Sequence, residues 1–404
     1  MADVRLAWLA THPIQYQAPL LRAVAATPGV DLTALFFSDM SVRGYVDREF
    51  GCTVEWDVPL LDGYRHEFLT RTGEREPGIS FLRPRISGLV ERLTRDHFDA
   101  VLVQGWNHYG YPLGAWLARR AGLKVLMRCE ATRHVTESTG LKGLARRAFV
   151  GLMLGQVDRF LAIGTRNREF YLSWGIPPER IGDMPYAVDN DFFHGRDAAV
   201  DRKALRASLG FAPDRPVILY ASKLTARKRA DDLLEAYRRL SLGGLEPNPY
   251  LVYAGDGELR PALEQRVAKL GWRSVRFLGF KNQGELLGYY ALADVFVLPS
   301  FNETWGLVVN EAMNAGCAIV VSDQVGSGVD LVEDGVNGAK FRAGDVAGLT
   351  RALDRTLQND AYLDMGRKSL ERIGRWGLTE DVVGLCEALS RLGLPVTSDH
   401  SQSA

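Results

Sequence analysis

The sequence predicts an α/β protein built from two doubly wound parallel sheets that follow one another along the chain. With 404 residues, the chain is too long for one ordinary core and suits two domains of roughly 200 residues each. Short apolar runs rich in β-formers alternate with longer amphipathic runs from one end to the other, which indicates parallel βαβ units. At 46% hydrophobic and 24% charged residues, the composition is that of a globular protein with sizeable cores.

Ten apolar runs are the expected strands, five in each half of the chain. In the first half they cover residues 5–10, 30–37, 100–106, 124–130 and 159–164, with a helical pattern at residues 112–122. In the second half they cover residues 216–222, 250–255, 275–280, 295–300 and 318–323. The polar stretch between the two series ends in two prolines and places the domain junction near residues 190–215. We therefore expect an N-terminal domain over residues 1–195, a C-terminal domain over 196–380, and a C-terminal helix over 381–404 that could return to the N-terminal domain and ends in a disordered tail.

The composition argues against several classes of protein. Lysine plus arginine equals aspartate plus glutamate at 49 each, whereas a general nucleic-acid binder would have a basic excess. The cysteines are too scattered for a zinc site or a disulfide framework; they are Cys52, Cys129, Cys317 and Cys386. The N-terminal residues lack the pattern of a signal peptide, and no apolar run approaches the roughly 18 residues of a membrane span. We expect a reduced, cytoplasmic protein.

Two lysines follow the first strand of the second series. Doubly wound sheets bind their ligands at the carboxyl ends of the strands, and two such sheets in sequence are expected to leave a cleft between them. Lys223 and Lys228 come just after the strand at 216–222. Ammonium groups on flexible stems suit a phosphate or diphosphate, although a solvated basic loop would have the same pattern. The sequence therefore predicts an anion site at this strand end.

Glycines mark two further strand ends. Gly255 begins the turn G-D-G at residues 255–257, where the backbone can turn tightly under a ligand. Gly279, Phe280 and Lys281 follow the next strand, where exposed backbone groups could hydrogen bond a planar base. Each of these could equally be a plain turn between a strand and a helix.

Two glutamates flank an apolar run in the segment FNETWGLVVNEAM, residues 301–313. We expect a loop followed by a helix that starts at Trp305 and is closed by Gly316 as its C-cap. Glu303 then lies before the helix, and Glu311 lies about two turns, roughly 8–9 Å, further along. The first helical turn between them would form an anion site with the backbone N–H groups of Trp305, Gly306, Leu307 and Val308. A diphosphate held there would place its sugar near Glu303 and the nucleoside ribose near Glu311, because a carboxylate can accept hydrogen bonds from paired hydroxyls.

At this point the second half resembles the nucleotide-sugar domain of glycosyltransferase family four, the retaining enzymes with the GT-B fold. Glu303, Trp305, Gly306 and Glu311 match the family's E-x7-E segment with its aromatic-glycine pair. Residues 222–228 are similar to its G-R-L-x-x-x-K phosphate loop. In that loop Ser222 replaces glycine, and Lys223 replaces arginine. The positive charge is kept, but the guanidinium group, which can donate two parallel hydrogen bonds, is lost.

Two further segments support the same resemblance. Residues 185–189, PYAVD, look like the family's P-N-G-V-D hinge, with Phe192 or Phe193 beyond it. Residues 316–341 resemble the family's next segment, with Asp330 where glutamate is usual. The resemblance in sequence covers nearly all of residues 155–390. In the first half, only the expected architecture of alternating strands and helices resembles the family. The resemblance implies two Rossmann-like doubly wound domains that face each other across a cleft.

The first half departs from the family at three strand ends. His12 and Gln15 stand where many relatives have a Gly-Gly pair. After the strand residues KVLM at 124–127, where relatives often have a histidine near the reacting sugar, this chain has Arg128 and Glu130 on either side of a cysteine. We therefore take Arg128 and Glu130 as candidate catalytic residues, and His12, Gln15 and His108 as candidate acceptor-binding residues. A structural role is open for each of them.

The resemblance implies transfer of a sugar, with retention of the anomeric configuration, from a nucleoside diphosphate sugar to a hydroxyl acceptor. UDP is the commonest donor nucleotide among relatives, and the acceptor could be a glycan, a lipid-linked glycan or a small molecule. Lys223 and Lys228 would stabilise the departing diphosphate together with the helix amides, without a divalent metal, and Glu303 would orient the sugar. No cofactor beyond this cosubstrate and no nucleic-acid partner is expected.

Other functions share parts of the pattern. A nucleotide-sugar epimerase has the same architecture, but the E-x7-E segment is not expected in it in this form. A pyridoxal-phosphate phosphorylase would normally be much longer. An inactive sugar-nucleotide-binding protein is the alternative without activity, and the retained Glu303, Lys228 and Glu311 argue against it.

One segment of the first half is both amphipathic and basic. It covers residues 140–155, GLKGLARRAFVGLMLG. The pattern allows a helix packed on the first sheet or a weak peripheral contact with the inner face of an anionic membrane.

Overall fold

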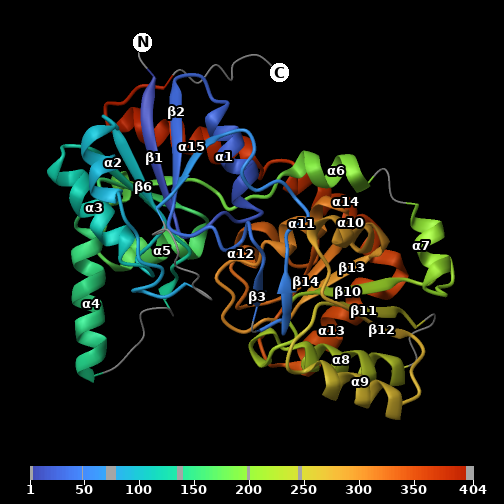
Figure 1. Ribbon diagram of the computed structural model, residues 1–404. Coiled ribbons are helices and arrows are strands. Elements are labelled where there is room, and N and C mark those ends of the chain that lie inside the picture. The colour runs from blue at the N-terminus through green and yellow to red at the C-terminus, as the bar shows by residue number, and fades with distance from the viewer. Residues whose placement is uncertain are drawn as a thin grey trace. The chain divides into compact units, whose positions relative to one another are not determined.

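The computed structural model describes residues 3–47, 49–69, 79–133, 140–197, 201–243 and 248–396 (Figure 1). The chain divides into two compact units. Unit 1 comprises the described residues within Met1–Tyr45, Val54–Ala187 and Gly377–Ala404, and unit 2 those within Val46–Thr53 and Val188–Trp376. The tail that the sequence predicts to be disordered lies, apart from Val396, outside the described residues.

In the described part of unit 1, seven parallel strands form one sheet in the order β5-β2-β1-β6-β7-β8-β9. The strands are β1 (Val4–Ala10), β2 (Val30–Phe36), β5 (Arg65–Phe68), β6 (Ala100–Val103), β7 (Lys124–Arg128), β8 (Arg159–Ala162) and β9 (Ile181–Asp183). The five strands expected from the sequence are all present. Strands β5 and β9 were not predicted, because short, partly polar strands lack an apolar run.

Helices cover both faces of this sheet (Figure 1). They are α1 (Gln17–Ala25), α2 (Leu89–Arg95), α3 (Gly110–Arg120), α4 (Gly140–Leu154), α5 (Thr165–Ser173) and α15 (Leu378–Arg391), with the short η2 (Pro178–Arg180) before β9. Successive residues of β1 point to opposite faces, so Ala7 and Leu9 join the core under α2, α3 and α5. Leu6 and Trp8 join the core under α1 and α15. Because both faces of the sheet are buried, the residues on each face of a central strand must be apolar, and the strand reads as a nearly continuous apolar run.

The described part of unit 2 has the same plan with six parallel strands, in the order β12-β11-β10-β13-β14-β15. The strands are β10 (Val217–Ala221), β11 (Tyr250–Ala254), β12 (Val275–Gly279), β13 (Val295–Leu298), β14 (Ala318–Ser322) and β15 (Gly338–Phe341). The helices are α6 (Asn190–Asp197), α7 (Arg202–Ser208), η3 (Ala226–Lys228), α8 (Ala230–Leu242), α9 (Arg260–Lys269), α10 (Gln283–Leu292), α11 (Val308–Asn314), α12 (Ser327–Leu331), α13 (Val346–Leu357), η4 (Gln358–Asp360) and α14 (Ala361–Ile373). The two sheets confirm the predicted fold class. β15 was not among the predicted strands.

The unit boundaries differ from those expected from the sequence. The chain passes from unit 1 to unit 2 at Ala187–Val188, before the expected residue 195, and residues 46–53 of the first half group with unit 2. This segment includes most of β3 (Tyr45–Asp47) and of β4 (Cys52–Val54), which pair as a small separate sheet. From Gly377 onward the chain belongs to unit 1. The hydrophobic periodicity of the sequence does not mark these unit boundaries. They depend on the unit against which each segment packs in the folded chain.

Helix α15 completes unit 1. Its apolar residues Leu385, Ala388 and Leu389 are fully buried in the core that also contains Leu6. The helix approaches β9 so closely that a Cβ atom on Gly384 would lie 1.9 Å from the carbonyl oxygen of Asp183. A glycine is therefore required at this contact.

A buried ion pair joins α15 to the end of β7. The Arg128 guanidinium donates to Asp381 Oδ1 at 2.8 Å, and the two side chains are 4% and 1% exposed. Arg128 also donates to the carbonyl oxygens of Met184 at 3.4 Å and Pro185 at 2.9 Å and lies 4.9 Å from the centre of the Tyr186 ring. Burial raises the pKa of Asp381 to about 7, while the guanidinium acts in the opposite direction. Arg128 therefore joins α15 to β7 within unit 1. It also lines a cavity at the carboxyl ends of the strands, so its predicted catalytic role stays a prediction.

We predict that Arg128→Ala lowers the unfolding free energy by about 3–5 kcal/mol, because it leaves the buried Asp381 carboxylate without its partner. The measurement is the urea unfolding midpoint by circular dichroism. Arg128→Met combined with Asp381→Leu should recover much of this loss, since no buried charge remains. Arg367→Ala, which breaks exposed ion pairs on α14, is the control and should cost less than about 1 kcal/mol. A double variant no more stable than Arg128→Ala would contradict the assignment.

Candidate functional site

Each sheet has one place where the strand order reverses direction. In unit 1, β1 lies between β2 and β6, and in unit 2, β10 lies between β11 and β13. Loops that leave two neighbouring strands toward opposite sides diverge and leave room at the carboxyl ends of those strands, which is where doubly wound sheets bind ligands. Several side chains predicted from the sequence lie at these two switch points.

At the switch point of unit 2, Lys228 and Glu303 meet. Lys228 follows β10 at the end of η3, Glu303 follows β13, and the Lys228 ammonium donates to Glu303 Oε2. Both side chains are largely buried, and Arg227 Nη1 lies 3.4 Å from the same oxygen. Burial lowers the pKa of Lys228, and the neighbouring Glu303 carboxylate opposes this shift. The backbone of Glu303 is held by two hydrogen bonds to residues 324–326, at 3.1 and 3.0 Å.

Lys223 lies in the same loop but has different partners. Its ammonium donates to Asp47 at 3.0 Å and to Glu49 at 2.6 Å, and it lies 4.8 Å from the centre of the Phe50 ring. Phe50 in turn contacts Phe280, with ring centres 4.9 Å apart. Residues 46–53 therefore bring two carboxylates and an aromatic ring to Lys223 and Phe280. Sequence reasoning missed this segment, because it lies more than 150 residues before the loop that it contacts.

Three further predicted residues lie at neighbouring strand ends. The N–H of Ser222 donates to the carbonyl of Ala254, and the N–H of Gly255 donates to the carbonyl of Gly279 at 2.8 Å. These bonds hold the carboxyl ends of β10, β11 and β12 together. Lys281 lies next along the chain and forms an ion pair with Glu285 at 2.8 Å on α10.

The segment 301–316 departs from the prediction at its first residues. Helix α11 begins at Val308, so Trp305, Gly306 and Leu307 precede it, and the anion site expected from a helix starting at Trp305 is not formed in that way. Gly306 has φ +90°, a backbone conformation that disfavours a helical start. Trp305 is buried, donates from Nε1 to Asn310 Oδ1 at 3.0 Å and stacks on Trp376 with ring centres 5.7 Å apart.

The end of α11 follows the prediction. The N–H of Gly316 donates to Met313, and that of Cys317 donates to Ala312. These two bonds are the Schellman arrangement that ends a helix at a glycine.

Glu311 lies inside α11 and is buried. Its Oε2 accepts a hydrogen bond from the Tyr290 hydroxyl at 2.7 Å. Burial raises the pKa of Glu311 to about 7, although the Tyr290 hydrogen bond acts in the opposite direction. The structure therefore shows how Glu311 is held and does not test its predicted contact with ribose.

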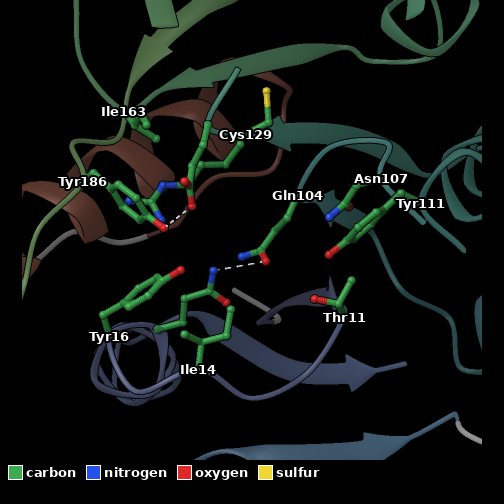
Figure 2. A pocket seen from close by; sticks show the side chains of 12 residues that line it. Thr11, Ile14, Tyr16, Gln104, Asn107, Tyr111, Cys129, Ile163 and Tyr186 are labelled. Carbon is green, nitrogen blue, oxygen red and sulfur yellow. Dashed lines mark hydrogen bonds between the residues drawn. The ribbon is translucent and has the colours of Figure 1, made fainter. Parts of the chain in front are cut away.

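At the switch point of unit 1, a small cavity of about 110 Å³ follows the ends of β1, β6, β7 and β8 (Figure 2). Figure 2 shows the side chains around it, which are mainly amides and hydroxyls: Thr11, Tyr16, Gln104, Asn107, Tyr111 and Tyr186. Gln17 also lines this cavity and donates to Gln104 Oε1 at 3.2 Å. Within the described part of the chain, the buried Oε1 of Gln17 has no hydrogen-bond partner. This oxygen could accept a hydrogen bond from a ligand hydroxyl.

A larger cavity of about 500 Å³ adjoins the first one. The two share Gln104, Asn107, Cys129 and Glu130. Its other walls are aromatic and basic, with Phe81, Trp106, Phe149 and Arg146. Glu130 accepts a hydrogen bond from the Tyr186 hydroxyl at 2.5 Å, so its carboxylate is oriented at the junction of the two cavities.

His12, Gln15 and His108 are not among the described residues that line these two cavities. His108 is fully buried, with Nε2 2.9 Å from the Pro84 carbonyl oxygen and Nδ1 accepting from the N–H of Gly110, so a structural role replaces its predicted acceptor contact. His12 lies 3.0 Å from Thr11 Oγ1, and burial lowers its pKa to about 4. Gln15 is partly buried, and its Oε1 has no partner in the described residues. Sequence reasoning missed Gln104 because the apolar run was extended to residue 106, whereas β6 ends at Val103 and Gln104 is the first residue beyond it.

Both halves of the chain match models of known protein families. Residues 14–187 match a family model described as "Glycosyl transferase 4-like domain", and residues 201–375 match one described as "Glycosyl transferases group 1". The chain belongs to glycosyltransferase family four. The second of these models spans Lys228, Glu303 and Glu311.

Two curated glycosyltransferases illustrate the relationship. D-inositol 3-phosphate glycosyltransferase 2 of Catenulispora acidiphila is 30% identical over 244 residues, which cover 58% of this chain and 56% of the relative. D-inositol 3-phosphate glycosyltransferase of Nocardia farcinica is 28% identical over 369 residues, which cover 86% of this chain and 75% of the relative. The chain thus spans little more than half of the length of the first relative.

Solved structures establish the fold. Anabaena Alr3699/HepE in complex with UDP superposes with a TM-score of 0.72 and 18% identity, covering 96% of this chain and all of that one. This likeness confirms the predicted GT-B fold class of two Rossmann-like units.

The described residues contain no group of three or more His, Cys, Asp or Glu side chains placed to hold a metal ion. Nor do the helices in the described ranges include one with the length and apolar character needed to cross a membrane.

We predict that Glu311 makes stability fall as the pH rises. The folded state raises its pKa from the ordinary 4.5 to about 7, so between these values the folded protein holds a proton that the unfolded chain has lost. This contribution is complete below pH 4.5 and is lost as the pH passes 7, by roughly 3 kcal/mol in total. Glu311→Gln stays neutral and should have a flatter profile of urea unfolding midpoint between pH 5 and pH 8. Parallel profiles for the two proteins would contradict this role of Glu311.

Proposed function

We propose that the protein transfers a sugar, with retention of configuration, from a nucleoside diphosphate sugar to a hydroxyl acceptor. The observation on which this proposal chiefly rests is the pairing of Lys228 with Glu303 at the switch point of unit 2. An ammonium and a carboxylate buried together at the carboxyl ends of two strands match the needs of a diphosphate and of a sugar hydroxyl. Membership of the glycosyltransferase family supports the same reading.

Unit 2 would hold the donor. Lys228 and Lys223 would stabilise the negative charge that develops on the diphosphate as it leaves. Glu303 would accept hydrogen bonds from the sugar hydroxyls, and Glu311 would lie on the nucleoside side. UDP is the nucleotide we propose, since the structurally similar HepE was solved in complex with it. The charge on the diphosphate would be balanced by these side chains, without a divalent metal.

Unit 1 would hold the acceptor in the small polar cavity and the larger one beside it. In the reaction, the bond between the sugar C1 and the diphosphate oxygen breaks, and the diphosphate departs with the bonding electron pair. The acceptor oxygen bonds to C1 and gives up its proton. We assign Glu130 as the group that orients this hydroxyl and takes the proton, because its oriented carboxylate lies at the junction of the two cavities. Gln17 Oε1 is a further acceptor for a hydroxyl group.

We predict that UDP raises the thermal unfolding midpoint more than GDP, ADP or dTDP, with and without EDTA. Binding at a hundredfold excess over Kd stabilises by about 2.7 kcal/mol. Lys228→Met should abolish the shift. Asp47→Asn with Glu49→Gln should increase UDP affinity several-fold, because Lys223 then loses two competing carboxylates.

Three results would count against parts of this proposal. The same shift for all four nucleotides would exclude a specific donor site. Loss of the UDP shift in EDTA would show that a metal is needed. Unchanged affinity in the Asp47/Glu49 variant would mean that Lys223 does not contact the diphosphate.

We predict that Glu303→Gln and Glu130→Gln lower the rate of UDP release from UDP-sugars by about 100-fold or more. Both variants should keep the UDP-induced thermal shift, because neither residue is assigned to the diphosphate. Glu130→Asp should restore part of the activity if the carboxylate takes a proton. The anomeric coupling constant of the product, measured by NMR, decides between retention and inversion. Near-normal turnover in Glu303→Gln would remove its assignment, and conversion of the donor sugar without any acceptor would favour an epimerase.

A further inference from the structure

Helix α4 exposes an apolar stripe on the side opposite to the one by which it packs. Leu141, Leu144 and Leu152 are 86%, 67% and 71% exposed. They recur at intervals of three and eight residues, so they share one face of the helix with the exposed Ala148. The buried residues of α4 lie on the other face and are Gly143, Val150, Met153 and Leu154. The packing of the helix on unit 1 therefore does not account for these leucines.

The charges beside this stripe have a single sign. The fifteen residues of α4 include Lys142, Arg146 and Arg147 and contain no aspartate or glutamate. The chain as a whole has a formal net charge of zero, so the positive charge here is local. Apolar residues flanked by basic ones on one helix are typical of an element that lies in the interface of an anionic membrane.

The same helix borders the larger cavity. Arg146 and Phe149 line this cavity from α4, and Phe81 lines it from a different segment. The rings of Phe81 and Phe149 are in contact, with centres 5.7 Å apart, and Phe81 and its neighbour Leu82 are both exposed. Exposed apolar side chains therefore lie at the wall of this cavity as well as on α4. In Figure 1, α4 lies on the outer side of unit 1.

We propose that α4 binds unit 1 to an anionic lipid surface, with Leu141, Leu144 and Leu152 inserted at the boundary of headgroups and acyl chains. Lys142 and Arg147, on the two sides of this stripe, would then lie beside lipid phosphates. A second copy of the chain is the other way to cover an apolar helix face. Two copies of α4 packed together would place basic side chains against basic side chains, which disfavours that contact. If the proposed transferase function holds, the cavity beside α4 receives an acceptor that is carried in the lipid surface.

The test is co-sedimentation of the full chain with vesicles of phosphatidylcholine, with and without phosphatidylglycerol. The wild type should bind the anionic vesicles and lose binding when sodium chloride is raised from about 0.05 to about 0.5 M. The triple variant Leu141→Gln, Leu144→Gln, Leu152→Gln should bind at least tenfold more weakly. Leu363→Gln, which changes a 62% exposed leucine on α14, is the matched control and should bind like the wild type. Circular dichroism and the unfolding midpoint should show that both variants are folded.

Two outcomes would overturn the proposal. One is no binding of the wild type to anionic vesicles at low salt, and the other is wild-type binding by the triple variant. If the triple variant instead converts a dimer to a monomer in analytical ultracentrifugation without a change in vesicle binding, a second copy is the occupant. Vesicle binding does not require catalysis, so it is separable from the transferase activity. UDP release in the absence of vesicles should be the same in the triple variant and the wild type.

Discussion

The reversal of strand order at β1 in unit 1 and at β10 in unit 2 is the constraint on which the rest of the molecule depends. At such a reversal, the connections that follow two neighbouring strands run to opposite sides of the sheet. The carboxyl ends of these two strands therefore stay uncovered at one position in each sheet. The apolar residues of the strands and helices bury the rest of each sheet. Both candidate sites therefore follow from topology, and the side chains that reach them are those that come directly after β1, β6, β7, β10 and β13.

Buried charges fall into two kinds in this protein. Arg128 is surrounded by acceptors of its own unit, and its pair with Asp381 holds the C-terminal helix against the sheet. Lys228 and Glu303 also neutralise each other, but they do so at a strand end where a ligand is expected. Removing a charged group from water is unfavourable in both cases, and a partner of opposite charge offsets it. The position in the sheet, and not the burial itself, separates the structural pair from the candidate functional one.

The two cavities of unit 1 differ in the chemistry of their walls. The small cavity is lined mainly by amides and hydroxyls, and the cavity beside it by aromatic rings and one arginine. Such a pair suits a ligand with a hydroxyl-rich end and a less polar continuation.

The sequence by itself determined the two parallel sheets and ten of their strands, and it indicated Lys228, Glu303 and Glu311 as candidate site residues. These depend on local patterns, namely apolar runs, the residues after each run, and motifs shared with a family. Only the tertiary structure decided that α11 starts at Val308, that Arg128 pairs with Asp381, and that residues 46–53 meet Lys223. These contacts join residues up to 253 positions apart, or depend on a backbone conformation such as that of Gly306, and no local pattern encodes them. The same holds for α4, whose amphipathic sequence allowed either face to pack, and whose buried face was selected by the core that it meets.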